Sequence, residues 1–202
     1  MPRDKSASHI RIMAAARAEF LRMGYEKASM RNIAERCGMT AAGIYRHCKD
    51  KEDLFDQLVS PAKVKLMDWA LAHMHRYEEP VKKNRKVVWQ DSFIDMMREV
   101  VYPDMEDYHL LIARSKGSKY ENYLHDMTQM AQDKFLEYLK ELRSSGIRAP
   151  EISAQQLHLL LTAYLTALFE PVVHNYPKEE ANEALATLEK FFLPGWKEMM
   201  DV

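Results

Sequence analysis

The sequence predicts an all-α protein, and three features of its 202 residues support this fold class. Apolar residues recur at helical spacing, as in Ile12, Ala15, Ala16, Phe20 and Met23, which fall on one face of a helix. The chain has only six glycines and no alternating apolar and polar runs of the kind that predict strands. The helical patterns end near glycine, proline or serine residues, where helices commonly stop.

Residues 29–51 predict two short helices joined by a tight turn. Ser29 can cap the first helix, and the buried stripe of that helix is Ile33, Ala34 and Cys37. Gly38 follows where a left-handed turn favours glycine, and Thr40 can cap the second helix. Ile44 faces inward, whereas the outward residues are Tyr45, Arg46 and His47. A helix–turn–helix of this kind presents its second helix to the DNA major groove, although an ordinary helical hairpin with solvated basic residues would share the pattern.

The distribution of charge supports the first interpretation. The net charge of the chain is −1, but residues 1–49 hold ten Lys and Arg against four Asp and Glu, a net +6. Residues 50–202 hold nineteen against twenty-six, a net −7. Positive charge is therefore concentrated around the helix–turn–helix, as expected for a surface that approaches DNA.

Several motifs together resemble the tetracycline-repressor (TetR) family of bacterial transcription regulators. They occupy residues 20–25, 29–40, 43–47 and 51–54, and the similarity extends from about Ile10 to Leu58. The remainder of the chain has no motif of comparable strength. The resemblance implies a DNA-binding domain at residues 1–58, a three-helix bundle, and a helical domain for ligand binding and dimerisation at residues 59–202. It further implies a cytoplasmic homodimer that binds a near-palindromic, double-stranded operator. The sequence has no Cys or carboxylate cluster with metal-ligand spacing, no Gly-rich phosphate loop and no nucleophile elbow, so we expect no enzymatic activity, cofactor or metal.

The resemblance also assigns roles within the helix–turn–helix. Positions matching Ala41, Ala42 and Gly43 lie closest to the base edges, and those matching Tyr45, His47 and Lys51 contact phosphates. Because residues 41–43 carry no hydrogen-bonding side chain, hydrogen-bonded base recognition would come mainly from Arg31, Arg46 or DNA shape. Arg31 can bind guanine, contact a phosphate or remain solvated, and these alternatives stay open. The DNA-binding candidates are Arg31, Thr40, Ala41, Ala42, Gly43, Tyr45, Arg46, His47 and Lys51.

Two further features bear on where the protein works. The N-terminus is polar, and no apolar run approaches membrane-spanning length, so we expect neither a secretion signal nor a membrane partner. The two cysteines, Cys37 and Cys48, both lie in the helical hairpin region. In a cytoplasmic protein we expect them to be small packing residues rather than a disulfide or a metal pair.

The middle of the second domain is rich in aromatic and methionine residues. Such side chains suit an apolar cavity for a small apolar or amphipathic ligand, although each could equally be an ordinary core residue. The helix that starts near Lys51 is expected to run toward Tyr77, bent or split near Pro61, so that Trp69 would help to line the cavity. The candidates for this pocket are Trp69, Trp89, Phe93, Met97, Tyr108, His109, Tyr120, Tyr123 and Met127.

The last two predicted helices carry broad apolar faces. Two such helices can form a four-helix interface with a second copy, although both could also be core helices of one subunit. The interface candidates are Leu161, Tyr164, Leu165, Leu168, Leu185, Leu188 and Phe192. Together these features predict a DNA-binding repressor released by a small ligand. The alternative is a DNA-binding protein of the same fold that is controlled by a protein partner.

Overall fold

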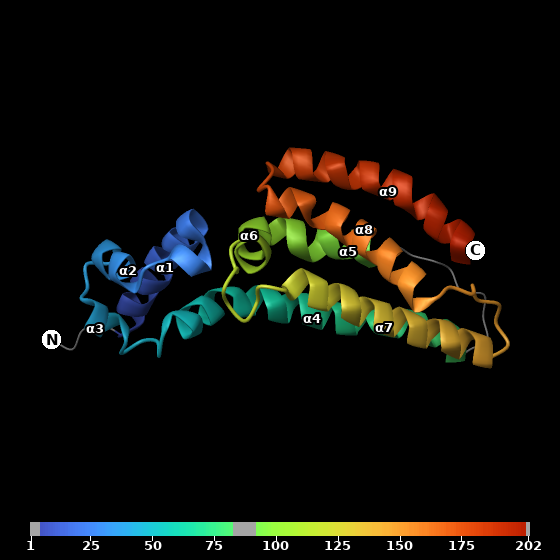
Figure 1. Ribbon diagram of the computed structural model, residues 1–202, viewed down its shortest axis with the longest axis horizontal. Coiled ribbons are helices and arrows are strands. Elements are labelled where there is room, and N and C mark those ends of the chain that lie inside the picture. The colour runs from blue at the N-terminus through green and yellow to red at the C-terminus, as the bar shows by residue number, and fades with distance from the viewer. Residues whose placement is uncertain (1–4, 83–91, 201–202) are drawn as a thin grey trace. The chain divides into compact units, whose positions relative to one another are not determined.

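A computed structural model describes residues 5–82 and 92–200, and within these ranges the regular structure is entirely helical (Figure 1). The all-α prediction is confirmed. In chain order the elements are α1 (Lys5–Lys27), α2 (Met30–Arg36), α3 (Ala41–Ile44), α4 (Lys51–Lys82), α5 (Ser92–Met96), the π-helix η1 (Met97–Val101), the 3-10 helix η2 (Tyr102–Asp104), α6 (Met105–Ala113), α7 (Tyr123–Ser144), α8 (Ala154–Val173) and α9 (Lys178–Met200).

The chain divides into two compact units. The N-terminal unit comprises residues 1–64 together with residues 106–122, and the C-terminal unit comprises residues 65–105 and 123–202. Residues 106–122 thus join the helix–turn–helix segment, although residues 65–105 separate them from it in the sequence. The division between the units at residue 64 falls inside α4.

The core of the N-terminal unit is aromatic and aliphatic. Phe20 of α1 packs edge-on against Phe55 of α4, with ring centres 4.9 Å apart, and the Tyr25 ring lies 5.2 Å from Phe55. Ile33 of α2 and Ile44 of α3 are fully buried. Burying each of these side chains stabilises the unit by about 1.5–3 kcal/mol, so the helix–turn–helix rests on a packed core.

Residues 106–122 are joined to this unit by specific contacts. The Tyr108 hydroxyl donates a hydrogen bond to the carbonyl oxygen of Ala62 at 2.9 Å, and Arg17 forms an ion pair with Asp107. The backbone N–H of Tyr25 donates to the carbonyl oxygen of Arg114 at 2.7 Å. Gly24 makes this bond possible, because its φ of 71° turns the end of α1 out of helical geometry, a conformation that glycine adopts without strain.

Helix α4 is longer and more continuous than predicted. It runs without interruption through both Pro61 and Pro80 to Lys82, so of the two predicted effects of Pro61, a bend or a split, the split was wrong. A proline inside a helix removes one backbone hydrogen bond, but burial of the surrounding turns can outweigh that loss. Val59, Ala62 and Leu66 are all buried on this stretch.

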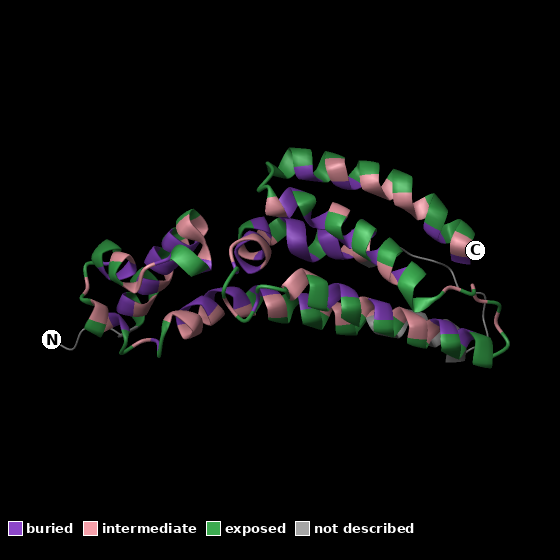
Figure 2. Ribbon diagram, viewed as in Figure 1, coloured by how far each residue is buried: buried purple, intermediate pink, exposed green. Residues whose placement is uncertain are grey.

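Helix α8 forms the centre of the C-terminal unit. It lies side by side with α7 and with α9 (Figure 1), and Ser153 and Gln156 form a reciprocal capping box at its start. By length and composition alone α8 could cross a membrane, contrary to the sequence-based expectation. Figure 2 shows buried positions along this helix, which is the pattern of a core helix. Its buried residues are Leu157, Leu161, Tyr164, Leu165, Leu168, Phe169, Pro171 and Val172.

Candidate nucleic-acid interface

Both helices of the helix–turn–helix are capped as predicted. The Ser29 hydroxyl oxygen accepts a hydrogen bond from the backbone N–H of Asn32 at 3.5 Å. Gly38 has a φ of 67°, the left-handed conformation expected between the helices. The Thr40 hydroxyl oxygen accepts from the backbone N–H of Gly43 at 3.1 Å. Local hydrogen bonds therefore determine where each helix begins.

The second helix, α3, is only four residues long and presents small side chains. Ile44 anchors it in the core, whereas Ala42, Tyr45 and Arg46 are exposed. The backbone N–H of Gly43 is engaged by Thr40, so a phosphate at the start of this helix would have to use the N–H groups of Ala41 or Ala42. Tyr45 and Arg46 are exposed, and their predicted contacts with DNA remain predictions.

Arg31 lies on the exposed surface of α2. Its guanidinium forms an ion pair with Glu35 one turn later, at 3.0 Å, and both side chains are largely exposed. Exposed pairs of this kind contribute only about 0.3–0.5 kcal/mol, so a nucleic acid could displace Glu35 at little cost. Arg31 is therefore available for a contact with a base or a phosphate.

Lys51 makes contacts within the chain that were not predicted from the sequence. Its ammonium group lies at the C-terminal end of α1, where it donates to the carbonyl oxygens of Tyr25 at 2.8 Å, Glu26 at 3.2 Å and Ala28 at 3.4 Å. An ammonium group has three donors, and all three are directed at this helix end, where a positive charge is favourable. The side chain thus joins α4 to α1, and the phosphate contact implied by the family resemblance remains a prediction.

Replacing Lys51 with Met is expected to lower the free energy of unfolding by about 1–2 kcal/mol, because the charged hydrogen bonds are lost while the apolar stem remains. The slope of log affinity against log salt for duplex DNA should not change. Urea denaturation and duplex titrations at several salt concentrations measure both quantities. The exposed Lys49→Met variant is the control for stability. A slope shallower by about one for Lys51→Met would show that the ammonium does contact a phosphate.

Glu19 links α1 to α2 and was not among the predicted residues. Its side chain is completely buried, and its carboxylate accepts hydrogen bonds from Arg22 at 2.9 Å and Asn32 at 3.0 Å. The Arg36 guanidinium lies 3.5 Å away. Burial acts to raise the pKa of Glu19, but the hydrogen bonds from Arg22 and Asn32 outweigh it and the pKa is lowered. The sequence offers one indication of this role, because Arg22 follows Glu19 at a spacing of three residues.

Replacing Glu19 with Gln is expected to lower the free energy of unfolding at neutral pH by about 1–3 kcal/mol, because the charged hydrogen bonds to Arg22 and Asn32 are weakened. The pKa of Glu19 is lower in the folded than in the unfolded protein. Its contribution is therefore complete above the unfolded value of about 4.3 and is lost as the pH falls through the folded value. Urea unfolding between neutral pH and pH ~3 should show the two proteins converging. The exposed Glu35→Gln variant is the control, and a difference that stays constant with pH would contradict the assignment.

Both cysteines are free and buried. The thiol of Cys37 donates to the carbonyl oxygen of Ala34 at 3.4 Å, and that of Cys48 to Ile44 at 3.7 Å. Burial, followed by the charges of Asp53 and Asp50, raises the pKa of the Cys48 thiol to about 11. The Cys48 thiol is therefore protonated at neutral pH, as expected for a packing residue rather than a metal ligand or a redox centre.

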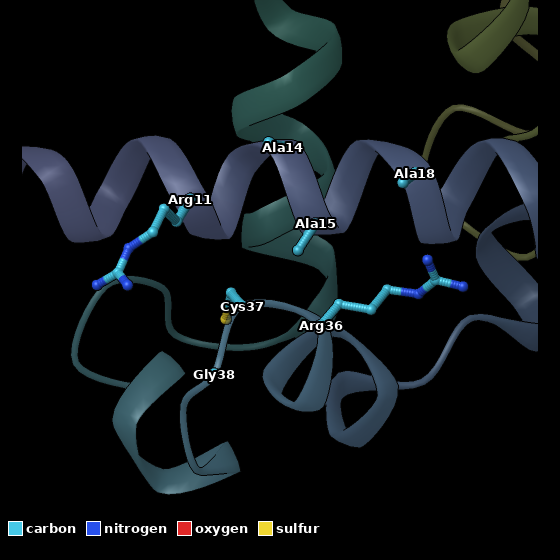
Figure 3. Close-up of a pocket in the computed structure, with 7 residues that line it drawn as sticks. All are labelled: Arg11, Ala14, Ala15, Ala18, Arg36, Cys37 and Gly38. Carbon is cyan, nitrogen blue, oxygen red and sulfur yellow. The ribbon is translucent and has the colours of Figure 1, made fainter.

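An open depression of about 630 Å³ lies between α1 and the end of α2 (Figure 3). Small residues line it, namely Ala14, Ala15, Ala18, Cys37 and Gly38. The side chains of Arg11 and Arg36 also belong to its lining, but they extend in opposite directions, and Arg36 is paired with Glu19. The two guanidinium groups therefore do not converge on one anion, and this depression is not assigned as a ligand site.

The predicted pocket residues are divided between the two units. Tyr108, His109 and Tyr120 belong to the N-terminal unit, where Tyr108 is bonded to Ala62 and the Tyr120 hydroxyl donates to Asp56. The other described candidates belong to the C-terminal unit, and they are Trp69, Phe93, Met97, Tyr123 and Met127. Trp89 lies outside the described residues. A pocket lining built from the second group remains a prediction.

One candidate in the C-terminal unit takes part in a polar cluster. The indole N–H of Trp69 donates to the Glu99 carboxylate at 2.8 Å, and the His73 ring stacks on Trp69 with ring centres 3.7 Å apart. The Nδ1 atom of His73 lies 2.8 Å from the carbonyl oxygen of Trp69. Its Nε2 atom is buried and has no hydrogen-bond partner among the described residues.

The predicted dimer residues are mostly buried by their own subunit. Five of the seven cannot form the contact surface of a second copy without unpacking α8 from its neighbours, and these five are Leu161, Tyr164, Leu165, Leu168 and Leu185. Leu188 and Phe192 are partly buried. The apolar residues that α8 and α9 leave exposed are different, with Leu159 at 70% and Phe191 at 75% exposure. A partner chain on these helices would meet Leu159 and Phe191 first.

Comparison with known proteins agrees with this geometry. Residues 12–58, which contain the complete helix–turn–helix, match the family described as "Bacterial regulatory proteins, tetR family". The "Uncharacterized HTH-type transcriptional regulator YfiR" of Bacillus subtilis (strain 168) is 21% identical over 201 residues, covering 94% of this chain and 91% of the relative. The "HTH-type transcriptional repressor AcnR" of Corynebacterium diphtheriae is 23% identical over 187 residues, covering 89% of this chain and 88% of the relative.

A solved structure shares the fold over nearly the whole chain. NalD of Pseudomonas aeruginosa, "the secondary repressor of MexAB-OprM multidrug efflux pump", superposes with a TM-score of 0.54 at 17% identity. The match covers 93% of this chain and 97% of NalD. The likeness therefore extends beyond the helix–turn–helix to the helical C-terminal half.

Proposed function

Because the chain belongs to the tetR family of bacterial regulatory proteins, which are DNA-binding transcription regulators and not enzymes, we propose that it is a cytoplasmic repressor released by a small ligand. In this proposal a homodimer binds a near-palindromic operator. An apolar or amphipathic ligand bound in the C-terminal half lowers the affinity for that operator.

The observation that carries DNA binding is the geometry of the helix–turn–helix. Helix α3 is capped by Thr40, anchored by Ile44 and flanked by exposed Tyr45 and Arg46. It lies in the part of the chain with a net charge of +6. An anchored, capped helix with exposed basic and hydroxyl groups is the arrangement that places a recognition helix in the major groove.

Selection of bound sequences from a random DNA duplex library tests this proposal. A twofold dimer should select a near-palindrome whose half-sites are about 34–36 Å apart, one turn of DNA, because two recognition helices must reach successive major grooves. A lone half-site should bind more weakly. Undiminished affinity for a lone half-site, or no sequence selection at all, would contradict the proposal.

Two features support control by a ligand. Helix α4 is continuous from Lys51, beside the helix–turn–helix, to the region of Trp69. Residues 106–122, which follow η2 along the chain, are bonded to α1 and to the first turns of α4. A ligand that prefers a displaced α4 must, by linkage, also weaken the fit of the recognition helices to DNA.

The energy required is modest. A hundredfold loss of operator affinity corresponds to a coupling of about 2.7 kcal/mol, which lies within the usual allosteric range. A thermal-shift screen with apolar and amphipathic organic compounds would identify ligands, and operator titrations would then measure their effect. A disulfide that locks the two DNA-binding units of the dimer should abolish release. Release of the locked dimer by a bound compound would exclude helix displacement as the mechanism.

A further inference from the structure

Two histidine rings lie together beside the recognition helix. His9, near the start of α1, and His47, just after α3, have ring centres 6.4 Å apart and ring planes at 30°. Both side chains are partly exposed. The backbone beside each ring is packed, because Ser8 and Cys48 are buried and the backbone N–H of His47 donates to the carbonyl oxygen of Ile44 at 2.7 Å.

Charged residues flank both histidines along the chain. Asp50 accepts a hydrogen bond from the backbone N–H of Asp53 at 2.7 Å, and Asp53 accepts one from that of Lys49, also at 2.7 Å. The Asp50 carboxylate therefore caps the start of α4, and that of Asp53 bonds to the residue before Asp50. The titratable or charged residues near the two histidines along the chain are Lys5, Arg11, Tyr45, Arg46, Cys48, Lys49, Asp50 and Asp53.

We propose that His9 and His47 together form a two-imidazole contact to the DNA backbone. His9 then supplies, from α1, a phosphate contact that lies outside the helix–turn–helix motif. The inference rests on the proposed function, because it requires DNA at this surface. A protonated imidazole donates a short, charge-assisted hydrogen bond to a phosphate oxygen, and the neutral ring forms a weaker one.

Proton uptake on DNA binding follows from this arrangement. The affinity for DNA rises as the pH falls from about 8 to 6, the interval in which histidine changes its charge. Because phosphates are common to all sequences, the effect does not depend on the operator. The other six histidines of the chain all follow residue 72, outside the helix–turn–helix.

Fluorescence anisotropy with the full-length protein and a mixed-sequence duplex of about three helical turns tests the proposal at low salt. We expect the wild-type affinity to rise about tenfold between pH ~8 and ~6, corresponding to an average uptake of roughly half a proton per binding event over this interval. His9→Phe keeps an aromatic ring against His47 but cannot be protonated, so the gain should fall to about threefold. His9→Lys carries a permanent charge, and it should bind at least as tightly as wild type at pH ~8 while showing the same reduced gain.

His125→Phe is the matched control, because His125 is an exposed histidine of α7 that also pairs with another histidine ring, that of His158. It should retain the full wild-type gain. A His9→Phe protein with the wild-type gain would overturn the proposal, and if that variant does not fold, His9→Lys provides the same comparison. Absence of duplex binding by the wild type at every pH would instead refute the proposed function, and this inference with it.

Discussion

Replacing Phe191 with Asp is expected to convert the dimer into monomers and to weaken operator binding at least a hundredfold. Phe191 of α9 is 75% exposed in the single chain, whereas its neighbour Phe192 packs on Tyr164 with ring centres 4.7 Å apart. Leu159 of the adjacent α8 is also largely exposed. A twofold interface contains each residue twice, so one substitution introduces two charges into an apolar contact. Loss of a central aromatic contact costs about 2–4 kcal/mol, and 2.7 kcal/mol is a hundredfold.

Analytical ultracentrifugation and operator titrations would measure the two effects of Phe191→Asp. Met130→Asp is the matched control, because Met130 is an exposed apolar residue of α7. It should leave both the mass and the affinity unchanged. If Phe191→Asp remains dimeric at the concentrations used for DNA binding, the interface lies on another face of the C-terminal unit.

Replacing Asp56 with Ala is expected to uncouple ligand binding from DNA release. The Asp56 carboxylate accepts a hydrogen bond from the hydroxyl of Tyr120 and lies 2.7 Å from the ammonium group of Lys119. The hydrogen bond from Lys119, followed by that from Tyr120, lowers the pKa of Asp56, so the carboxylate is ionised at neutral pH. The Glu52 carboxylate, one turn earlier, accepts a hydrogen bond from the backbone N–H of Lys119 at 3.1 Å. These contacts connect the start of α4 to residues 106–122.

A ligand found by thermal shift that lowers the operator affinity of the wild type a hundredfold should lower that of Asp56→Ala by about tenfold or less, since a loss of 1.4 kcal/mol in coupling is a factor of ten. Hydrogen exchange should also become faster in the first turns of α4, because local contacts that oppose opening are lost. Asp68→Ala, at an exposed carboxylate of the same helix, is the control. Equal release of both variants would show that the coupling bypasses Asp56.

The helix–turn–helix could be predicted closely because its determinants are local. Ser29 and Thr40 each bond to a backbone N–H three residues away, and Gly38 needs only its own conformational freedom. Lys51 could not be placed in this way, since its acceptors belong to Tyr25 and its neighbours, more than twenty residues earlier. A single lysine has the same sequence signature whether it contacts a phosphate or a helix end.

The buried faces of α8 and α9 show a second limit. Helical periodicity predicts which side of a helix is apolar, but it does not say whether the same chain or another copy covers that side. Leu161 and Leu165 are covered by their own subunit, whereas Phe191 is not. Nor could sequence alone assign residues 106–122 to the N-terminal unit, because the bond between Tyr25 and Arg114 joins residues that are far apart in the chain.

Pro61 makes one turn of α4 less stiff than the turns around it. A proline has no backbone N–H, so the carbonyl oxygen of Gln57, four residues earlier, lacks the hydrogen bond that stiffens every ordinary turn. Helix α4 nevertheless continues on both sides of Pro61, for 32 residues in all. Bending forces along a rod concentrate where it is most compliant, and between Lys51 and Trp69 that place is the turn between Gln57 and Pro61. A force that displaces α4 near Trp69 would therefore change the angle of the helix axis at this turn, beside Asp56, rather than stretch the helix along its axis.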